Sequence, residues 1–382
     1  MRYIPYGRQN IDTQDIKSVI EVLRSDWITQ GPRIPEFEKD LCAYTGARYA
    51  VAVSSGTAAL HIACLAAGIN KGDEVITSPI TFVASANAVL YCGGKVVFAD
   101  VRGDTINIDP EEVRRKITKK TKAIIPVDFA GHPVESEQLG ALAKKNGLCI
   151  IEDACHALGA EYKGNKAGSG KFSDMTVFSF HPVKHITTGE GGAITTNRKD
   201  LYERLVMLRS HGITRDRKRL IRYDGPWSYE QHYLGFNYRI TDLQCALGIS
   251  QLKKLDAFLS KRRKIVSLYN KNLAGLEGVL LPEEKPYVRS AWHLYYIRLK
   301  DSGIRKTVFQ RLRRAGIGAQ VHYLPVHMQP YYRKSLGYTG AGLSTAEKYY
   351  SQTISLPLYP AMKTEEILYV IRVLKGIVSG LT

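Results

Sequence analysis

The sequence predicts an α/β fold, with a mostly parallel sheet covered by helices in a large domain and a smaller C-terminal α/β domain after it. Short apolar runs rich in β-branched residues alternate with helical patterns between residues 49 and 153. This alternation is typical of parallel sheets, whose strands are buried on both faces. The chain has 382 residues, 44% of them hydrophobic, which is enough for two cores. No apolar run approaches the roughly 20 residues that span a bilayer.

The first expected element is a helix over residues 13–26. Ile16, Val19, Ile20 and Leu23 recur there at helical spacing and form one apolar face. Strands are then expected over residues 49–54, 74–80, 95–101, 122–130, 148–153 and 175–180. The helices between them are expected to end at residues 67 and 91 and to begin at residues 110 and 136.

The last third of the chain follows a different pattern. After Thr241 a long helical pattern runs toward Leu268, and we expect it to link the two domains. Beyond it we expect a strand over residues 292–299, a helix over 305–315 and a strand over 318–323. The large domain, with its N-terminal helical segment, is placed at residues 1–255 and the small domain at 256–382.

Lys184 and Asp153 both lie at the ends of expected strands. Lys184 follows the apolar run 175–180 and precedes a glycine-rich segment, where backbone can come close to a ligand. A lysine amine can hold the aldehyde of pyridoxal phosphate (PLP) as a Schiff base, and a buried aspartate can keep the pyridine nitrogen protonated. Each residue also has an ordinary alternative, because most lysines are solvated and a carboxylate at a strand end is often a helix cap.

A third segment runs from the strand 49–54 through Ser55, Gly56 and Thr57 into an Ala/Leu-rich helix. The free N–H groups and the positive dipole end of that helix suit a phosphate, and Gly56 removes a side chain that would block it. An ordinary N-capped helix is the alternative. The order of phosphate cup, then Asp153, then Lys184, each at a strand end, favours a ligand site, because ligands of open α/β sheets bind there.

Residues 55–60, 152–159, 178–184, 189–192 and 235–244 carry five motifs that resemble, in this order, those of the DegT/DnrJ/EryC1/StrS sugar aminotransferases. The resemblance extends from Tyr6 to about Met362. It implies an aminotransferase of fold type I, a PLP cofactor held as a Schiff base on Lys184, Asp153 as the acid at the ring nitrogen, and L-glutamate as the amino donor.

The resemblance also implies roles around the cofactor. Phe82 corresponds to an aromatic residue that stacks on the ring, although burial in the core is an equally good reading of an aromatic side chain. Gly56, Thr57 and Ser179 correspond to phosphate ligands. His156 occupies the position near the ring's 3-hydroxyl, where many relatives carry Gln, and either side chain can form a hydrogen bond there.

Further positions correspond to the family's substrate contacts and subunit contacts. The substrate-contacting positions are Tyr6, Trp27, Ile28, Thr29, Ser55, His322 and Tyr323. Asn237 corresponds to a residue that crosses a two-fold axis and completes the phosphate site of the neighbouring subunit. The resemblance therefore implies a homodimer with shared active sites. A local turn residue beside Gly235 is the alternative for Asn237.

Residues 27–31, 321–327 and 354–360 are most similar to the branch of the family that serves pseudaminic acid biosynthesis. That branch implies UDP-2-acetamido-2,6-dideoxy-β-L-arabino-hex-4-ulose as the amino acceptor. Aminotransferases for other UDP- and dTDP-4-keto-6-deoxysugars share most of these residues and remain an alternative. A sugar dehydratase of the family carries histidine where this chain has Lys184. A nicotinamide oxidoreductase is disfavoured, since no G-x-G-x-x-G follows the early strands.

A formal net charge of +18 is compatible with a nucleic-acid-binding protein, because basic proteins bind phosphate polymers. The charge is spread along the chain, however, and its densest run, between Arg215 and Arg222, continues into a segment with loop chemistry. A solvated loop is the expectation, and a flap that attracts a diphosphate substrate is the alternative. We expect neither nucleic acid nor a membrane as a partner, and a non-catalytic nucleic-acid-binding relative remains a distant alternative.

The six cysteines include no CxxC pair, and the ten histidines show no metal-ligand spacing. We therefore expect neither a disulfide framework nor a metal site. The N-terminal residues show no apolar stretch followed by a small-residue cleavage site. The expected compartment is the cytoplasm.

Overall fold

The computed structural model describes residues 3–381. At its centre lies a seven-stranded sheet with strand order β1-β9-β8-β5-β4-β2-β3. All neighbouring strands run parallel except β9, which is antiparallel to both β1 and β8. The strands are β1 (Tyr49–Val53), β2 (Glu74–Thr77), β3 (Lys95–Phe98), β4 (Thr121–Ile125), β5 (Cys149–Asp153), β8 (Met175–Ser179) and β9 (Gly192–Thr196). The predicted mostly parallel sheet is confirmed.

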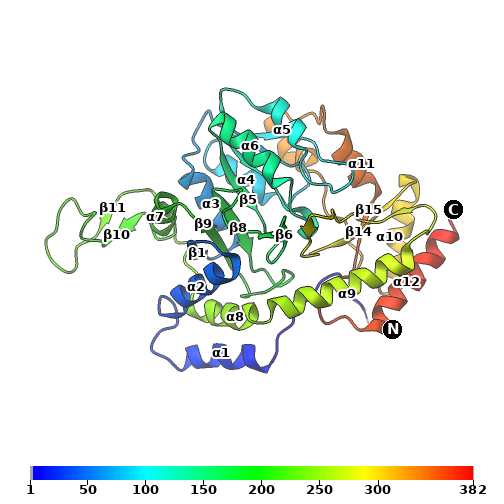
Figure 1. The fold of residues 1–382 in the computed structure, drawn as a ribbon, viewed down its shortest axis with the longest axis horizontal. Helices are drawn as coiled ribbons and strands as arrows, with labels where there is room; N and C mark the ends of the chain where they lie inside the picture. The colour runs from blue at the N-terminus through cyan, green and yellow to red at the C-terminus, as the bar shows by residue number, and fades with distance from the viewer. Residues whose placement is uncertain (1–2, 382) are drawn as a thin grey trace.

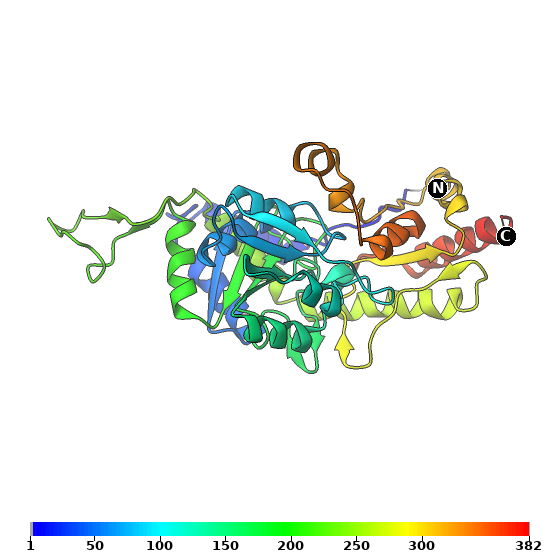
Figure 2. The ribbon, with the colours of Figure 1, turned by 90° about the horizontal axis from the view of Figure 1, so that it is seen from above.

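Helices cover both faces of this sheet (Figures 1 and 2). One face packs against α3 (Gly56–Ala66), α4 (Ala84–Tyr91) and α7 (Lys199–Leu208). The other packs against α2 (Arg33–Thr45), α5 (Pro110–Lys116), α6 (Ser136–Asn146) and α8 (Asp242–Leu252). Successive residues of a strand serve opposite faces, so that Ile150 and Ile151 of β5 belong to different apolar clusters.

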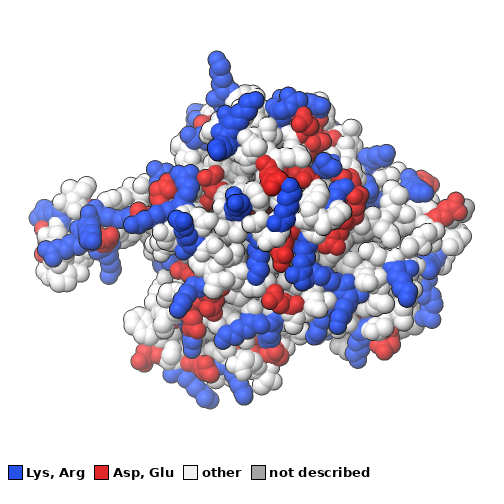
Figure 3. Space-filling view, viewed as in Figure 1, with Lys and Arg blue, Asp and Glu red and all other residues white. Residues whose placement is uncertain are grey.

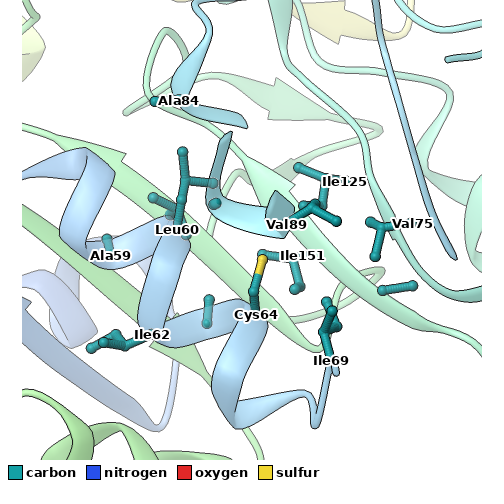
Figure 4. Packing of buried hydrophobic residues seen from close by; sticks show 14 of the residues in the cluster. Ala59, Leu60, Ile62, Cys64, Ile69, Val75, Ala84, Val89, Ile125 and Ile151 are labelled. Carbon is teal, nitrogen blue, oxygen red and sulfur yellow. The ribbon is translucent and has the colours of Figure 1, made fainter. Parts of the chain in front are cut away.

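The α3 face carries a cluster of buried apolar residues behind the predicted phosphate cup. Leu60 and Cys64 of α3 lie over the sheet residues Val75, Ile125 and Ile151, all buried (Figure 4). Because α3 is buried on nearly every side, its first turn is held at the carboxyl edge of the sheet. The core thereby fixes where the N-terminus of α3 points.

The C-terminal part is built around a three-stranded antiparallel sheet with strand order β12-β14-β15. Its elements are α9 (Leu255–Leu273), β12 (Val279–Leu280), β14 (Tyr295–Leu299), α10 (Arg305–Arg314), α11 (Ser344–Gln352), β15 (Thr353–Leu356) and α12 (Thr364–Ser379). Ile4, near the other end of the chain, packs into the same apolar cluster. The long helix predicted after Thr241 is two helices, α8 and α9, separated at Lys253 and Lys254. The domain boundary after residue 255 stays a prediction.

The strand predicted over residues 318–323 is wrong. Only Gln320 forms a bridge, to Ser355, and β15 is the strand that pairs with β14. Since both edges of β14 are occupied by β12 and β15, the segment lies outside β15. After that single bridge it leaves the sheet and carries Tyr323 to the side chain of His156.

The predicted first helix is present as α1 (Thr13–Leu23), but the environment of its apolar face is unusual. Ile16 is 53% exposed and Leu23 60% exposed, whereas Asp15 is fully buried. Asp15 accepts hydrogen bonds from Ser250 and Gln251 of α8. Within this chain α1 is therefore held by the side that carries Asp15 and the buried Val22, and the apolar stripe with Ile16 and Leu23 faces outward.

An arm formed by residues 213–235 projects from the body of the molecule (Figures 1 and 2). It contains the short pair β10 (Ile213–Thr214) and β11 (Glu230–Gln231). Ile221 is 93% exposed and Leu234 82% exposed on this arm. A third small sheet joins β6 (Glu161–Tyr162), β7 (Asn165–Lys166) and β13 (Val288–Arg289). Across residues 3–381, no helix is long and apolar enough to cross a membrane.

Candidate active site

A pocket of about 430 Å³ opens at the carboxyl ends of β5 and β8, against the first turn of α3. Most of the residues predicted from the sequence line this one pocket. They are Tyr6, Ser55, Gly56, Thr57, Phe82, Asp153, His156, Ser179, Lys184, His322 and Tyr323. Segments from five parts of the chain, around residues 6, 55, 82, 153–184 and 322, therefore converge here, as expected of a ligand site at the edge of a parallel sheet.

Lys184 lies in the loop that follows β8. Its backbone N–H donates to the carbonyl of His181 at 2.9 Å, which fixes the turn. Within residues 3–381 its amine forms neither a hydrogen bond nor an ion pair, although Asp153 and Cys155 favour its charged form. Burial lowers the pKa of the amine. An amine with a lowered pKa and no fixed partner is suited to nucleophilic and acid/base work.

Asp153 ends β5 and is 4% exposed. The hydroxyl of Ser85, in α4, donates to its Oδ2 at 2.6 Å, and the backbone N–H of Cys155 donates to its Oδ1 at 3.2 Å. These two bonds fix the plane of the carboxylate. A carboxylate fixed at this depth can accept a proton-bearing ring nitrogen as a further partner.

Ser85 is a site residue that the sequence analysis missed. Its hydroxyl also lies 2.7 Å from that of Thr81, so the two form a short polar chain behind Asp153. Ser85 lies three residues after Phe82, one helical turn away, and that spacing is the only sequence signal that places it near the site.

The first turn of α3 forms an anion cup. The Ser55 hydroxyl caps the helix by accepting from the N–H of Ala58 at 3.0 Å, which leaves the N–H groups of Gly56 and Thr57 without a partner within residues 3–381. A Cβ added at Gly56 would lie 2.9 Å from the Cβ of Ser179. Glycine is therefore required where the cup meets β8, and the open N–H groups suit a phosphate.

His156 and Phe82 both line the pocket. The Nε2 of His156 lies 3.2 Å from the hydroxyl of Tyr323, while its buried Nδ1 has no hydrogen-bond partner among the described residues. Burial, with the charge of Lys184 next, lowers the pKa of His156, so the ring is neutral at pH 7. Phe82 is 59% exposed, with its ring centroid 6.4 Å from that of Tyr323. A half-open aromatic face and an unpartnered ring nitrogen both suit a planar, hydroxyl-bearing ligand.

The outer wall of the pocket is formed by His322 and Tyr6. The Nδ1 of His322 lies 2.9 Å from the hydroxyl of Ser355, and the rings of Tyr6 and His322 are 5.4 Å apart. Burial lowers the pKa of His322 to about 4 and raises that of Tyr6. Both side chains are therefore neutral hydrogen-bonding groups at pH 7.

Together these features fit PLP. A lysine amine with a lowered pKa, a fixed carboxylate, open N–H groups at a helix start, an aromatic face and an unpartnered imidazole nitrogen all border one cavity. They match the aldehyde, the ring nitrogen, the phosphate, the ring face and the ring hydroxyl of the cofactor. Among the described residues, no group of three or more His, Cys, Asp or Glu side chains could hold a metal ion.

Trp27, Ile28, Thr29 and Asn237 do not line the pocket of this chain. All four are exposed. Their segments, residues 27–31 and 237–242, are joined by hydrogen bonds, among them Gln30 Nε2 to the carbonyl of Ile240 at 2.8 Å. We call these two segments the outer shelf. The structure thus gathers the remaining predicted residues at a second place on the surface.

Comparison with known proteins agrees with this geometry. The model of the DegT/DnrJ/EryC1/StrS aminotransferase family matches residues 9–375. A Campylobacter jejuni protein named UDP-4-amino-4,6-dideoxy-N-acetyl-beta-L-altrosamine transaminase is 42% identical over 372 residues, covering 96% of this chain and 95% of that protein. The spore coat polysaccharide biosynthesis protein SpsC of Bacillus subtilis is 40% identical over 382 residues, covering 99% and 98%.

Two solved structures are similar along their whole length. PseC of Helicobacter pylori, an aminotransferase involved in the biosynthesis of pseudoaminic acid, superposes with a TM-score of 0.92 at 35% identity, covering 99% of this chain and 100% of that one. Spr1654 of Streptococcus pneumoniae, in its PLP form, has a TM-score of 0.92 at 31% identity and covers 100% of both chains.

Proposed function

Since the chain belongs to the DegT/DnrJ/EryC1/StrS aminotransferase family, we propose that it transfers an amino group from L-glutamate to the 4-keto carbon of a UDP-linked deoxysugar. It is a PLP-dependent sugar aminotransferase. The proposed acceptor is UDP-2-acetamido-2,6-dideoxy-β-L-arabino-hex-4-ulose. The observation that carries the proposal is the single pocket in which Lys184, Asp153 and the open turn of α3 meet.

PLP, when bound, supplies an electron-withdrawing ring that stabilises negative charge on a carbon that loses a proton. In our proposal Asp153 holds the proton on the pyridine nitrogen, with Ser85 and the N–H of Cys155 keeping its carboxylate in place. The N–H groups of Gly56 and Thr57 and the hydroxyl of Ser179 bind the phosphate. Phe82 packs against the ring face, and His156 bonds the ring hydroxyl.

Lys184 is the residue that moves protons. Its Nζ takes the proton from the α-carbon of the amino donor and, in the second half of the reaction, delivers a proton to C4 of the sugar. Burial lowers the pKa of this amine, which increases the fraction that is free to accept a proton at neutral pH. Asp153 and Cys155 favour the charged form of this amine, which lets it hold the proton between the two positions.

The sugar assignment rests on the relatives and on the outer wall. The Campylobacter jejuni relative is named as the transaminase of a UDP-4-aminosugar, and the Helicobacter pylori enzyme is described as an aminotransferase involved in the biosynthesis of pseudoaminic acid. Tyr6, His322 and Tyr323 present neutral hydroxyl and imidazole groups at the pocket mouth, which suit a sugar ring better than a free amino acid. A different nucleotide sugar is the second candidate, because SpsC is named for spore coat polysaccharide and is nearly as similar.

We further propose that the working unit is a homodimer with shared active sites. Trp27, Ile28, Thr29 and Asn237 lie on the outer shelf, outside the pocket of their own chain. The apolar stripe of α1 and the apolar residues of the arm are also exposed, and exposed apolar surface of this kind marks interaction sites. In an isologous dimer each outer shelf reaches the pocket of the neighbouring subunit, where Asn237 completes the phosphate site.

The test is an acceptor panel. The purified enzyme, loaded with PLP, is incubated with L-glutamate and each of several 4-keto nucleotide sugars, and the products are identified by mass and NMR. We expect amination of the UDP-linked 4-keto-6-deoxy-N-acetylhexosamine and competition by free UDP. If UDP does not inhibit and a plain 2-keto acid is the better acceptor, the sugar assignment is wrong and the enzyme is a general aminotransferase.

A further inference from the structure

A second cavity, of about 630 Å³, opens on the surface between α9 and the β6–β7 hairpin. It shares no lining residue with the pocket that holds Lys184. Figure 3 shows the molecule in the view of Figure 1, and Lys and Arg side chains lie over α9 on this face, with acidic side chains between them. The basic residues of the wall are Lys166, Arg263, Lys264 and Arg289, and the acidic ones are Glu161 and Asp256.

Both acidic groups already have partners. Asp256 accepts a hydrogen bond from the hydroxyl of Tyr44 at 2.7 Å. Glu161 pairs with Arg289, with 3.2 Å between the guanidinium nitrogen and the carboxylate oxygen. Lys166 donates to the carbonyl of Tyr44 at 2.9 Å. Glu161 therefore balances the charge of Arg289. Among the other residues of the wall, the positive charges of Lys166, Arg263 and Lys264 exceed the single negative charge of Asp256.

Part of this excess positive charge belongs to Arg263. It forms no hydrogen bond or ion pair within residues 3–381, and its Nε is buried without a partner. Burial, and then the positive charge of Arg289, lower the pKa of Arg263. The neighbouring Arg262 shows the contrast, because it points inward and donates to the carbonyls of Trp292, His293 and Leu358. A partly buried guanidinium with no acceptor is costly unless a ligand supplies one.

We propose that this cavity, named here the α9 cleft, binds a small phosphorylated anion. Arg263 offers a planar fork that fits two phosphate oxygens, and Lys264 adds a mobile positive charge beside it. Ser260 and Ser267 of the same wall provide hydroxyl donors. The anion would join α9 to β7 and β13, which come from distant parts of the sequence, and its binding therefore stabilises the fold.

The site is tested on the PLP-loaded enzyme by titration calorimetry with inorganic pyrophosphate. The variant is Arg263→Gln, and the matched control is Lys261→Gln, which removes one charge from an exposed position of the same helix outside the cleft. We expect wild type and control to bind alike, and Arg263→Gln to bind about tenfold more weakly or to lose one pyrophosphate per chain. The same variant should lose the rise in Tm that pyrophosphate gives to the control.

Equal binding by Arg263→Gln and Lys261→Gln overturns the proposal. If Arg263→Gln does not fold, the double variant Lys264→Gln/Arg289→Gln, which changes two exposed residues, takes its place with the same expectation. Equal binding of tricarballylate would show that the cleft recognises charge and not phosphate, and would overturn the assignment of the ligand. Amino transfer should be unchanged in Arg263→Gln, so failure here is distinct from failure of the proposed function.

Discussion

The pocket and the outer shelf differ in how far their side chains are buried and hydrogen-bonded within one chain. In the pocket, Asp153 is buried and doubly hydrogen-bonded, and the positions of Lys184 and Gly56 are fixed by the core behind them. On the outer shelf, Trp27 is 59% exposed and Asn237 is exposed too, with the apolar stripe of α1 also open to solvent. The difference supports our proposal that one chain forms most of the pocket, whereas the outer shelf, with Asn237, completes the site of a neighbouring subunit.

The largest effect is expected from Lys184→Ala. The variant keeps the phosphate cup and Asp153, so it should bind PLP, but it has no amine to hold the aldehyde or move the proton. We expect no turnover and no borohydride-reducible linkage between cofactor and protein. Persistence of both the linkage and the activity would move the assignment to another lysine, and Lys163→Ala, an exposed lysine outside the pocket, is the control.

Asp153→Asn should reduce the rate by about 10²-fold or more, the loss typical when a preorganised electrostatic group is removed. The amide keeps the shape of the carboxylate and its bond from Ser85, but it loses the charge that holds the ring-nitrogen proton. Single-turnover reaction with glutamate, followed by the visible spectrum, measures the loss. Near-normal half-reaction rates would show that the proton is held by another group.

Ser85→Ala should have a smaller effect, about tenfold, because it removes one hydrogen bond to the charged carboxylate and leaves the charge in place. Ser78→Ala is the matched control, since Ser78 is a buried serine whose hydroxyl, within residues 3–381, bonds only to the backbone of Ile80. A shift in the pH dependence of the visible band in Ser85→Ala, but not in the control, would distinguish positioning of Asp153 from general destabilisation. Identical behaviour of the two variants contradicts the role given to Ser85.

Subunit mixing tests the outer shelf directly. Asn237→Asp, which places a negative charge beside the phosphate, and Lys184→Ala should each be inactive alone. Refolded together they should regain up to about a quarter of wild-type activity, since random pairing yields half heterodimers and each has one intact site. No recovery in heterodimers verified by mass would place Asn237 in its own subunit's site or outside the site altogether.

The smallest effect concerns stability against pH. Burial lowers the pKa of His156, His185 and His293 well below the usual range, and that of His322 to about 4. Between pH 6.5 and 4 the unfolded chain therefore binds protons that the folded chain does not, and the free energy of unfolding falls as pH falls.

Urea unfolding at pH 7 and pH 5 measures this loss. Asp128 opposes it, because burial and the charge of Glu152 raise its pKa and its folded form gains a proton. Comparing wild type with His293→Gln isolates one imidazole. The variant should lose less stability than wild type between the two pH values, and an equal or greater loss would contradict the assignment of a neutral, buried His293.

The sequence by itself determined the features that depend on the succession of strand and helix patterns along the chain. Alternating β-branched runs and helical patterns predicted the parallel sheet, and the strand ends at Asp153 and Ser55 placed the ring acid and the phosphate cup at one edge. The predicted sheet is confirmed and the two strand ends meet in one pocket, because a parallel sheet brings its carboxyl ends together whatever the details of packing; the roles of Asp153 and Ser55 stay predictions. Five motifs, among them the one around Lys184, indicated the family, and the pairing of Lys184 with Asp153 indicated the cofactor.

Other features were decided by contacts between residues far apart in the sequence. The hydrogen bond from Ser85 to Asp153 spans 68 residues, and no local pattern indicates it. The expected strand around Gln320 is reduced to one bridge, to Ser355 of β15, because the chain then turns to carry Tyr323 to His156. Helical spacing gave the apolar stripe of α1, but only the packing of Asp15 against α8 decided that the stripe faces outward. Periodicity fixes which residues share a face, and tertiary contacts decide what that face meets.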